Sequence, residues 1–182
     1  MEPVSVNFAL TRDDCENGAI ARLKMMYPGK TLALLRISGF LLFCAGCAMV
    51  AVGVLLRQPL AWIGALFAVA GVFIAFFVRP AQEAAVRHMA GEGFDSGRFG
   101  TPAQRISFGP EGVSLRSERY EADIPYGMLY AVYSDENVLL LFTASDEWRI
   151  VPKRTMDAAG RRRVESLLAE RMKQKFFQEG AR

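Results

Sequence analysis

Residues 37–56 read ISGFLLFCAGCAMVAVGVLL, a run of twenty positions without a charged side chain. Arg36 precedes the run and Arg57 follows it. Because an α-helix rises about 1.5 Å per residue, a helix of this length spans the hydrocarbon core of a bilayer, which is about 30 Å thick. The stretch therefore predicts a transmembrane helix, and it is the strongest signal in the sequence.

A second apolar run follows almost at once. Residues 60–78 hold nineteen uncharged positions, and Arg79 and Pro80 close the run. Only three residues, 57–59, separate the two runs. So short a connection forces two helices to run antiparallel and side by side, with both outer ends on one side of the bilayer. We therefore predict a two-helix transmembrane hairpin over residues 37–78.

The distribution of basic residues predicts the orientation of this hairpin, because Lys and Arg near the ends of a span stay in the cytoplasm. Arg57 alone lies in the turn, whereas the other ends carry Arg22, Lys24, Lys30, Arg36, Arg79 and Arg87. We expect a multi-pass protein of the cytoplasmic membrane with both termini cytoplasmic. Because the first 36 residues are polar and mixed, unlike a secretory signal, we expect the first span to be an uncleaved anchor.

Small residues recur along one side of each predicted span. They are Gly39, Gly46 and Gly53 in the first, and Gly64, Ala68, Gly71 and Ala75 in the second. Small side chains let two helix backbones approach closely, which favours helix association inside a bilayer. We interpret these stripes as helix-packing residues of the hairpin's own seam. The alternative is that they form the dimerisation face of a homodimer.

Residues 79–103 are expected to connect the hairpin to a second region. The part up to residue 90 can extend the second helix beyond the membrane. From 90 to 103 the chain is rich in helix-breaking residues, namely Gly91, Gly93, Gly97, Gly100 and Pro102. Such a composition is typical of a flexible linker.

Residues 104–180 are predicted to form a cytoplasmic domain. Apolar and polar residues alternate through six short segments between 104 and 152, as in strands with one buried face. Short turns between successive strands favour antiparallel pairing, and Pro125 should end a strand because it cannot donate to a ladder. Thr155 is expected to cap a final amphipathic helix, whose apolar residues are Val164, Leu167, Leu168, Met172 and Phe176.

The N-terminal region, residues 1–36, shows a strand followed by a helix. Apolar residues at positions 4, 6, 8 and 10 alternate with other residues, and Thr11-Arg12-Asp13-Asp14 has the capping-box pattern. We predict that this strand pairs with or packs on the C-terminal sheet, so that the cytoplasmic domain is split around the hairpin. The expected fold is thus a membrane α-helical hairpin plus an α+β domain, a small antiparallel sheet or barrel closed by a C-terminal helix.

Several stretches together resemble the bacterial YcxB-like family. They are residues 8–14 (FALTRDD), the two adjacent spans, the step 124–126 (IPY) and the segment 150–154 (IVPKR). The resemblance covers pattern and order over most of the chain, and it implies a pleckstrin-homology-like sheet domain on a hairpin anchor in the bacterial inner membrane. It implies no catalytic residue. Cys15 and Gly18 depart from the pattern and should weaken the first helix.

Few residues in the sequence can support catalysis or hold a metal. His88 is the only histidine, and no cysteine or carboxylate pair lies near it at ligand spacing. Cys44 and Cys47 form a C-x-x-C inside the first span, where burial in hydrocarbon disfavours a thiolate, so we interpret them as packed apolar side chains. We therefore expect no enzyme, no metal and no cofactor.

Basic residues in the C-terminal segment are the candidate anionic-lipid contacts. They are Lys153, Arg154, Arg161, Arg162 and Arg163, with Lys173 and Lys175 beyond them. Basic residues close to an anionic leaflet gain about 1 kcal/mol each. The competing interpretation is that they form the solvated face of an amphipathic helix, since carboxylates are interspersed among them.

The function expected from the sequence is binding. The first hypothesis is a membrane-anchored regulatory module that recognises a protein partner, through an exposed strand edge. The alternative is anionic-lipid recognition or membrane organisation through the basic helix. A channel or transporter subunit fits less well, because Ser38 is the only notable polar residue within the spans. A net charge of +3 does not indicate nucleic-acid binding.

Overall fold

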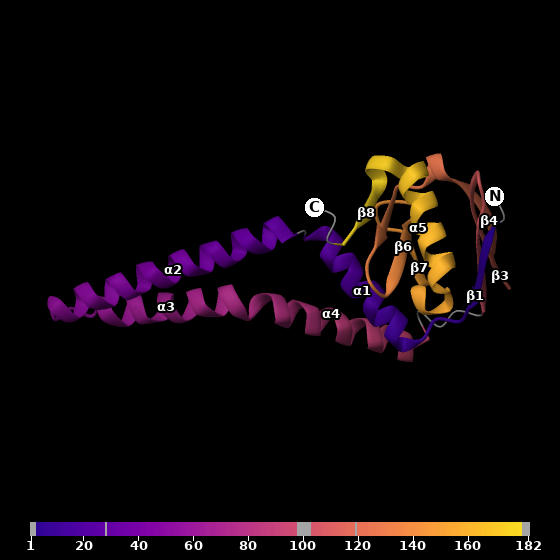
Figure 1. Cartoon of the computed structure of the whole chain (residues 1–182). Helices are drawn as coiled ribbons and strands as arrows, with labels where there is room; N and C mark the ends of the chain where they lie inside the picture. Colours follow the sequence, from indigo (N-terminus) through magenta and orange to yellow (C-terminus); the bar gives the residue numbers. More distant parts are fainter. Residues whose placement is uncertain (1–2, 28, 98–102, 119, 180–182) are drawn as a thin grey trace. The chain divides into compact units, whose positions relative to one another are not determined.

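The computed structural model describes residues 3–27, 29–97, 103–118 and 120–179 (Figure 1). The chain forms two compact units, which are described separately. One comprises residues 26–85, and the other combines residues 1–25 with residues 86–182. The predicted linker residues 98–102 and the last predicted domain residue, 180, lie outside the described part of the chain.

The unit of residues 26–85 consists of long helices. Helix α2 (Gly29–Leu55) and helix α3 (Leu60–Phe76) pack against each other along their lengths. Among the described residues, the segment Thr31–Leu55 is the one helix long and apolar enough by itself to cross a membrane. Helix α3 passes that test only together with helix α4 (Val78–Asp95), from which it is bent by 54°.

The turn between α2 and α3 is closed by two backbone hydrogen bonds. The N–H of Gln58 donates to the carbonyl of Gly53 (2.9 Å), and the N–H of Arg57 donates to that of Val54 (3.3 Å). This pair of bonds is a Schellman motif, and Arg57 takes the left-handed position with φ of 51°. Pro59, which follows, cannot continue the helix, so the chain reverses within a few residues.

The other unit contains two four-stranded sheets. The first, sheet A, has the order β1 (Val4–Phe8), β2 (Gln104–Phe108), β3 (Gly112–Ser117) and β4 (Tyr120–Pro125), and all its pairings are antiparallel. Val6 of β1 lies opposite Ile106 of β2. The prediction that the N-terminal strand joins the C-terminal sheet is confirmed, as is the strand end at Pro125.

The second sheet, sheet B, has the order β7 (Trp148–Pro152), β6 (Val138–Phe142), β5 (Ala131–Ser134) and β8 (Phe176–Gln178). Strand β8 runs parallel to β5, a pairing that the sequence analysis missed. The predicted closed barrel is wrong for the described residues, because the strands form two separate sheets. A 3₁₀ turn, η1 (Tyr126–Met128), carries the chain from one sheet to the other.

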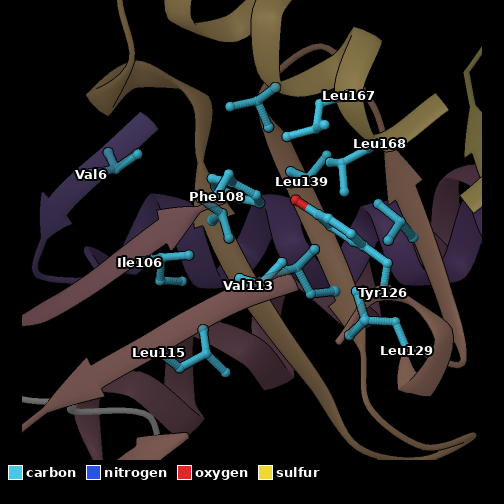
Figure 2. Packing of buried hydrophobic residues seen from close by; sticks show 14 of the residues in the cluster. Val6, Ile106, Phe108, Val113, Leu115, Tyr126, Leu129, Leu139, Leu167 and Leu168 are labelled. Carbon is cyan, nitrogen blue, oxygen red and sulfur yellow. The ribbon is translucent and has the colours of Figure 1, made fainter. Parts of the chain in front are cut away.

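The main core lies between the two sheets and helix α5 (Ala158–Met172) (Figure 2). Leu139 comes from sheet B, Ile106 and Phe108 come from sheet A, and Leu167 and Leu168 point in from α5. The helix begins two residues later than predicted. Its N-cap is Asp157, which accepts from the N–H of Gly160 (2.7 Å), whereas the Thr155 hydroxyl donates to the Pro152 carbonyl (2.7 Å).

Helix α1 (Arg12–Met26) covers the other face of sheet B. Its predicted capping box is confirmed, because the N–H of Thr11 donates to Asp14 Oδ2 (2.8 Å) and the N–H of Asp14 donates to Thr11 Oγ1 (3.3 Å). Cys15 is buried in this contact. A methyl group on Gly18 would lie 2.6 Å from Ile150 Cδ1, so the glycine is what lets the helix approach β7 this closely.

Helix α4 runs through the first glycines of the predicted linker. Gly91 and Gly93 are helical and buried, and the helix ends only at Asp95. A methyl group on Gly91 would lie 2.7 Å from the Arg12 guanidinium of α1. The helix continues through these positions despite the low helix propensity of glycine, and Phe94 near its end packs against the buried cluster that α1 forms with sheet B.

Candidate functional site

The histidine and the C-x-x-C cysteines singled out in the sequence do not form a metal site in the described part of the chain. No group of three or more His, Cys, Asp or Glu side chains there could hold a metal ion. His88 is exposed on α4, with its Nε2 3.3 Å from Glu92 Oε1. Cys44 and Cys47 are free thiols on the exposed surface of α2. The histidine and these two thiols are therefore surface groups.

The small residues predicted to pack the hairpin lie where α2 meets α3. A methyl group on Gly39 would lie 2.8 Å from the backbone nitrogen of Ala75, and one on Gly64 would lie 2.7 Å from the carbonyl oxygen of Gly46. Real Cβ atoms do not approach backbone so closely, so only glycine fits at these positions.

The remaining small residues extend the same contact in both directions. Gly46 faces Ala68, Gly53 faces Ala61, and Gly71 faces Phe43. The glycines of both helices are thus used within one hairpin. Each of these glycines already contacts the other helix of the same hairpin. They are therefore not available for the close helix contact that a homodimer face would need.

The five predicted lipid-contact residues have very different surroundings. Lys153 lies in the short turn η2 (Lys153–Thr155), and only 6% of its side chain is exposed. Its Nζ donates to Glu165, to the backbone carbonyl of Asp135 and to Ser134 Oγ (2.8 Å). Ser134 Oγ in turn donates to Glu165 Oε1 (3.0 Å). Lys153 therefore joins β5 to α5 inside the domain and is not available to a headgroup.

Arg154 forms a two-pronged ion pair with Asp14, far away in the sequence. Its Nη2 lies 2.6 Å from Asp14 Oδ2 and its Nε lies 2.9 Å from Oδ1. Burial by itself raises the pKa of Asp14, but the hydrogen bonds from Arg154 and Thr11 outweigh it, so the pKa lies below its ordinary value. The pair fastens the start of α1 to the segment after β7, and it fixes the guanidinium on one carboxylate.

The three arginines of α5 also differ in how far they are buried. Arg161 is half-buried, and its Nη2 donates to the carbonyl of Lys153 (3.1 Å). Arg162 and Arg163 are exposed. Of the five predicted contacts, these two are exposed and form no ion pair among the described residues, whereas Arg154 is 51% exposed but paired with Asp14. The partners Asp14 and Glu165 could not be found from the sequence, since neither is near its basic partner in the chain.

Strand β4 forms a free edge of sheet A. It pairs with β3 on one side, and no strand in the described part of the chain pairs with its other side. The N–H of Tyr126 donates to the carbonyl of Glu111 (3.3 Å), so Tyr126 and Glu111 form a hydrogen-bonded pair of the antiparallel ladder. Along such a ladder, hydrogen-bonded and non-hydrogen-bonded residue pairs alternate. By that alternation Glu121 and Asp123 turn their backbone groups outward. Both residues are exposed, so this edge can accept a further strand.

The fold and these surfaces define a class of protein: a two-sheet α+β domain, assembled from both ends of the chain, with a helical hairpin inserted between its parts. Residues 108–168 match the family model described as YcxB-like protein, which confirms the resemblance to the YcxB-like family over about a third of the chain. No curated protein and no solved structure matches the chain.

Proposed function

We propose that the chain is a membrane-anchored binding module, whose sheet domain recognises an extended segment of a protein partner in the cytoplasm. Its anchor would be the hairpin of α2 and α3, with both termini on the cytoplasmic side. The observation that carries the proposal is the free edge of β4, with which no strand in the described part of the chain pairs on its outer side.

The anchor rests on α2 and on its close packing with α3. Thr31–Leu55 meets the length and composition of a span. The apolar run 60–78 also continues past the end of α3, and the bend at Phe77 is explained by Pro80, whose missing N–H cannot bond to the carbonyl of Phe76. A bent second crossing is compatible with the membrane, and the glycine contact keeps the two helices together.

The domain has the element order expected of a pleckstrin-homology-like fold. Seven strands pair antiparallel in two successive sets, and a C-terminal helix packs at the open end of the core. This order supports that assignment. Such folds serve many functions, so the function must be argued from the surface rather than from the fold.

The edge of β4 favours a basic partner. Its exposed side chains include Asp123 and Glu121, of which Glu121 is paired with Arg116 of β3 (3.0 Å), and the region 104–152 carries four arginines against eight carboxylates. A bound strand would gain main-chain hydrogen bonds from the edge, whereas Lys or Arg at alternate positions would be attracted by the carboxylates. We therefore expect an extended segment with a net positive charge.

The edge is tested by blocking it without disturbing the β3–β4 ladder. Asp123→Pro removes an outward N–H, and Asp123→Ala removes only the carboxylate. The full chain is crosslinked in native membranes and purified. A partner that is retained by Asp123→Ala and lost with Asp123→Pro supports the proposal. A partner that both variants retain equally, or the absence of any partner on the wild-type chain, contradicts it.

The anchor is tested separately by alkaline carbonate extraction of membranes that contain the full chain. An integral hairpin stays in the membrane pellet, and tags on both termini are digested only when the cytoplasmic side is exposed to protease. Release of the chain by carbonate contradicts the anchor. Tags on opposite sides contradict the two-span topology.

A further inference from the structure

A loop between the two sheets displays apolar side chains to solvent. In the segment 126–130, Tyr126 and Leu129 are buried, and the Tyr126 hydroxyl donates to the carbonyl of Gly109 (2.8 Å). Met128 and Tyr130, in contrast, are 74% and 56% exposed. The buried residues fix the loop to the core, so that Met128 and Tyr130 are held outward on a rigid support.

Basic residues surround this loop at the C-terminal end of α5. Lys175 Nζ donates to the carbonyl of Leu129 (3.0 Å), between the two exposed side chains. Arg171 lies in the last turn of α5, and α5 contacts the η1 turn that carries Met128. Burial raises the pKa of Tyr126, and the positive charge of Arg171 partly opposes the rise. Lys173 follows in the turn η3 (Lys173–Lys175). Arg171, Lys173 and Lys175 are all exposed.

We propose that Met128, Tyr130, Arg171, Lys173 and Lys175, named here the loop patch, form a contact site for anionic lipid headgroups at the membrane surface. Tyr and Met would enter the interfacial layer, and the three cations would lie at the level of the phosphates. In the described part of the chain no carboxylate forms an ion pair with any of the three cations, so their charge is available to a ligand.

The chemistry of the loop patch favours a lipid surface over a protein segment. A strand partner needs a free edge and a helix needs a groove, whereas Met128 and Tyr130 protrude from a turn. A bilayer surface adapts to such a protrusion and supplies many negative charges at once. Arg162 and Arg163 are equally basic and exposed, but α5, which carries them, contributes no exposed large apolar side chain.

The inference rests on the anchor of the proposed function, because an anchored chain keeps the domain close to the bilayer at a high effective concentration. It does not rest on the β4 edge. Lipid contact by the loop patch and strand binding by β4 use different residues, so either can fail without the other.

The test places a photoreactive benzoyl-phenylalanine at position 130 of the full chain. The protein is reconstituted in nanodiscs of phosphatidylethanolamine and phosphatidylglycerol, or of phosphatidylcholine alone. We expect crosslinks to lipid in the first and few in the second. The same probe at Tyr120, which is 46% exposed on β4, serves as the matched control and should crosslink little lipid in either.

Charge is tested with two matched double variants. Arg171→Gln with Lys173→Gln should lower the lipid crosslinking at position 130 by about tenfold, because each cation near an anionic leaflet contributes to binding. The control variant, Arg162→Gln with Arg163→Gln, removes the same amount of charge elsewhere on α5. It should change the lipid crosslinking at position 130 little.

Three outcomes overturn the inference: no lipid crosslink in the anionic nanodiscs, an equal effect of both double variants, or crosslinks from position 130 in native membranes that join a protein instead of lipid. Failure of the anchor itself would be recognised beforehand, since carbonate would release the chain and no nanodisc would retain it.

Discussion

At the scale of single residues, basic side chains in one stretch of sequence have different surroundings. Lys153 and Arg162 are both basic and lie nine positions apart, yet the first is buried against Glu165 and the second is exposed. A charge is retained in the interior only when a partner compensates its lost hydration. Which basic residue has a partner depends on what the fold brings near it, and this is why five candidates from the sequence became two.

Replacing Lys153 with Met is expected to lower the free energy of unfolding of the sheet domain by about 2 kcal/mol, because Glu165 and Ser134 lose their charged donor. Arg162→Met should change it by less than about 0.5 kcal/mol. Both are measured by urea-dependent proteolysis of the full chain in detergent. Equal loss in the two variants would contradict the internal role of Lys153.

The Asp14–Arg154 pair predicts a pH-dependent contribution to stability. Because the folded pKa of Asp14 lies below its ordinary value of about 3.9, the pair stabilises the fold above that pH and loses its effect as pH falls through the lower folded pKa. Asp14→Asn should therefore cost about 1–2 kcal/mol at neutral pH. The difference from wild type should shrink in acid, and a difference that is constant with pH would contradict this account.

At the scale of elements, the helices and strands whose apolar residues recur with a clear periodicity were predictable. The exceptions are elements that the local sequence does not signal. The apolar runs predicted α2 and α3, and alternation predicted the strands. Helix α4 was expected to yield to a linker at its glycines, but it continues through Gly91 and Gly93 to Asp95. Strand β8 is only three residues long, and its parallel pairing with β5 has no local signature.

The α2–α3 contact predicts a sharp difference between two small-residue positions of α2. Gly46→Val would place side-chain atoms on the backbone of Ala68, whereas Ala48→Val enlarges an exposed side chain on the same helix. Overpacking a tight helix contact costs about 1–3 kcal/mol or more. We expect Gly46→Val to separate the helices, measured as a lower midpoint of thermal unfolding of the hairpin in detergent. If Ala48→Val had the same effect, the seam would be assigned wrongly.

At the scale of the whole chain, the sheet domain depends on residues that precede the hairpin. Strand β1 forms an edge of sheet A, and Val6 and Phe8 are buried in the main core. Residues 104–179 therefore lack one strand and part of their core without the first ten residues of the chain. The hairpin connects two parts of one domain.

Val6→Asp is expected to destabilise the domain by more than about 3 kcal/mol, because a carboxylate would be buried without a partner. Asn7→Asp lies on the same strand, is exposed, and keeps an oxygen acceptor for Arg105 Nε, which is 2.7 Å from Asn7 Oδ1. It should have little effect. Protease resistance of residues 104–179 in the full chain measures both, and a domain that resists protease equally in the two variants would contradict the role of β1.

The sequence by itself determined the two apolar runs, the tight turn between them, the alternating strands and the capping box of α1, because each depends on neighbours within a few residues. Only the tertiary structure decided that the strands form two sheets instead of a barrel. It also decided that Lys153 is held by Glu165 and Arg154 by Asp14. The exposure of Met128 and Tyr130 near the lysines of η3 was likewise visible only in the structure. Those features are contacts between distant parts of the chain, whose partners depend on packing rather than on local sequence.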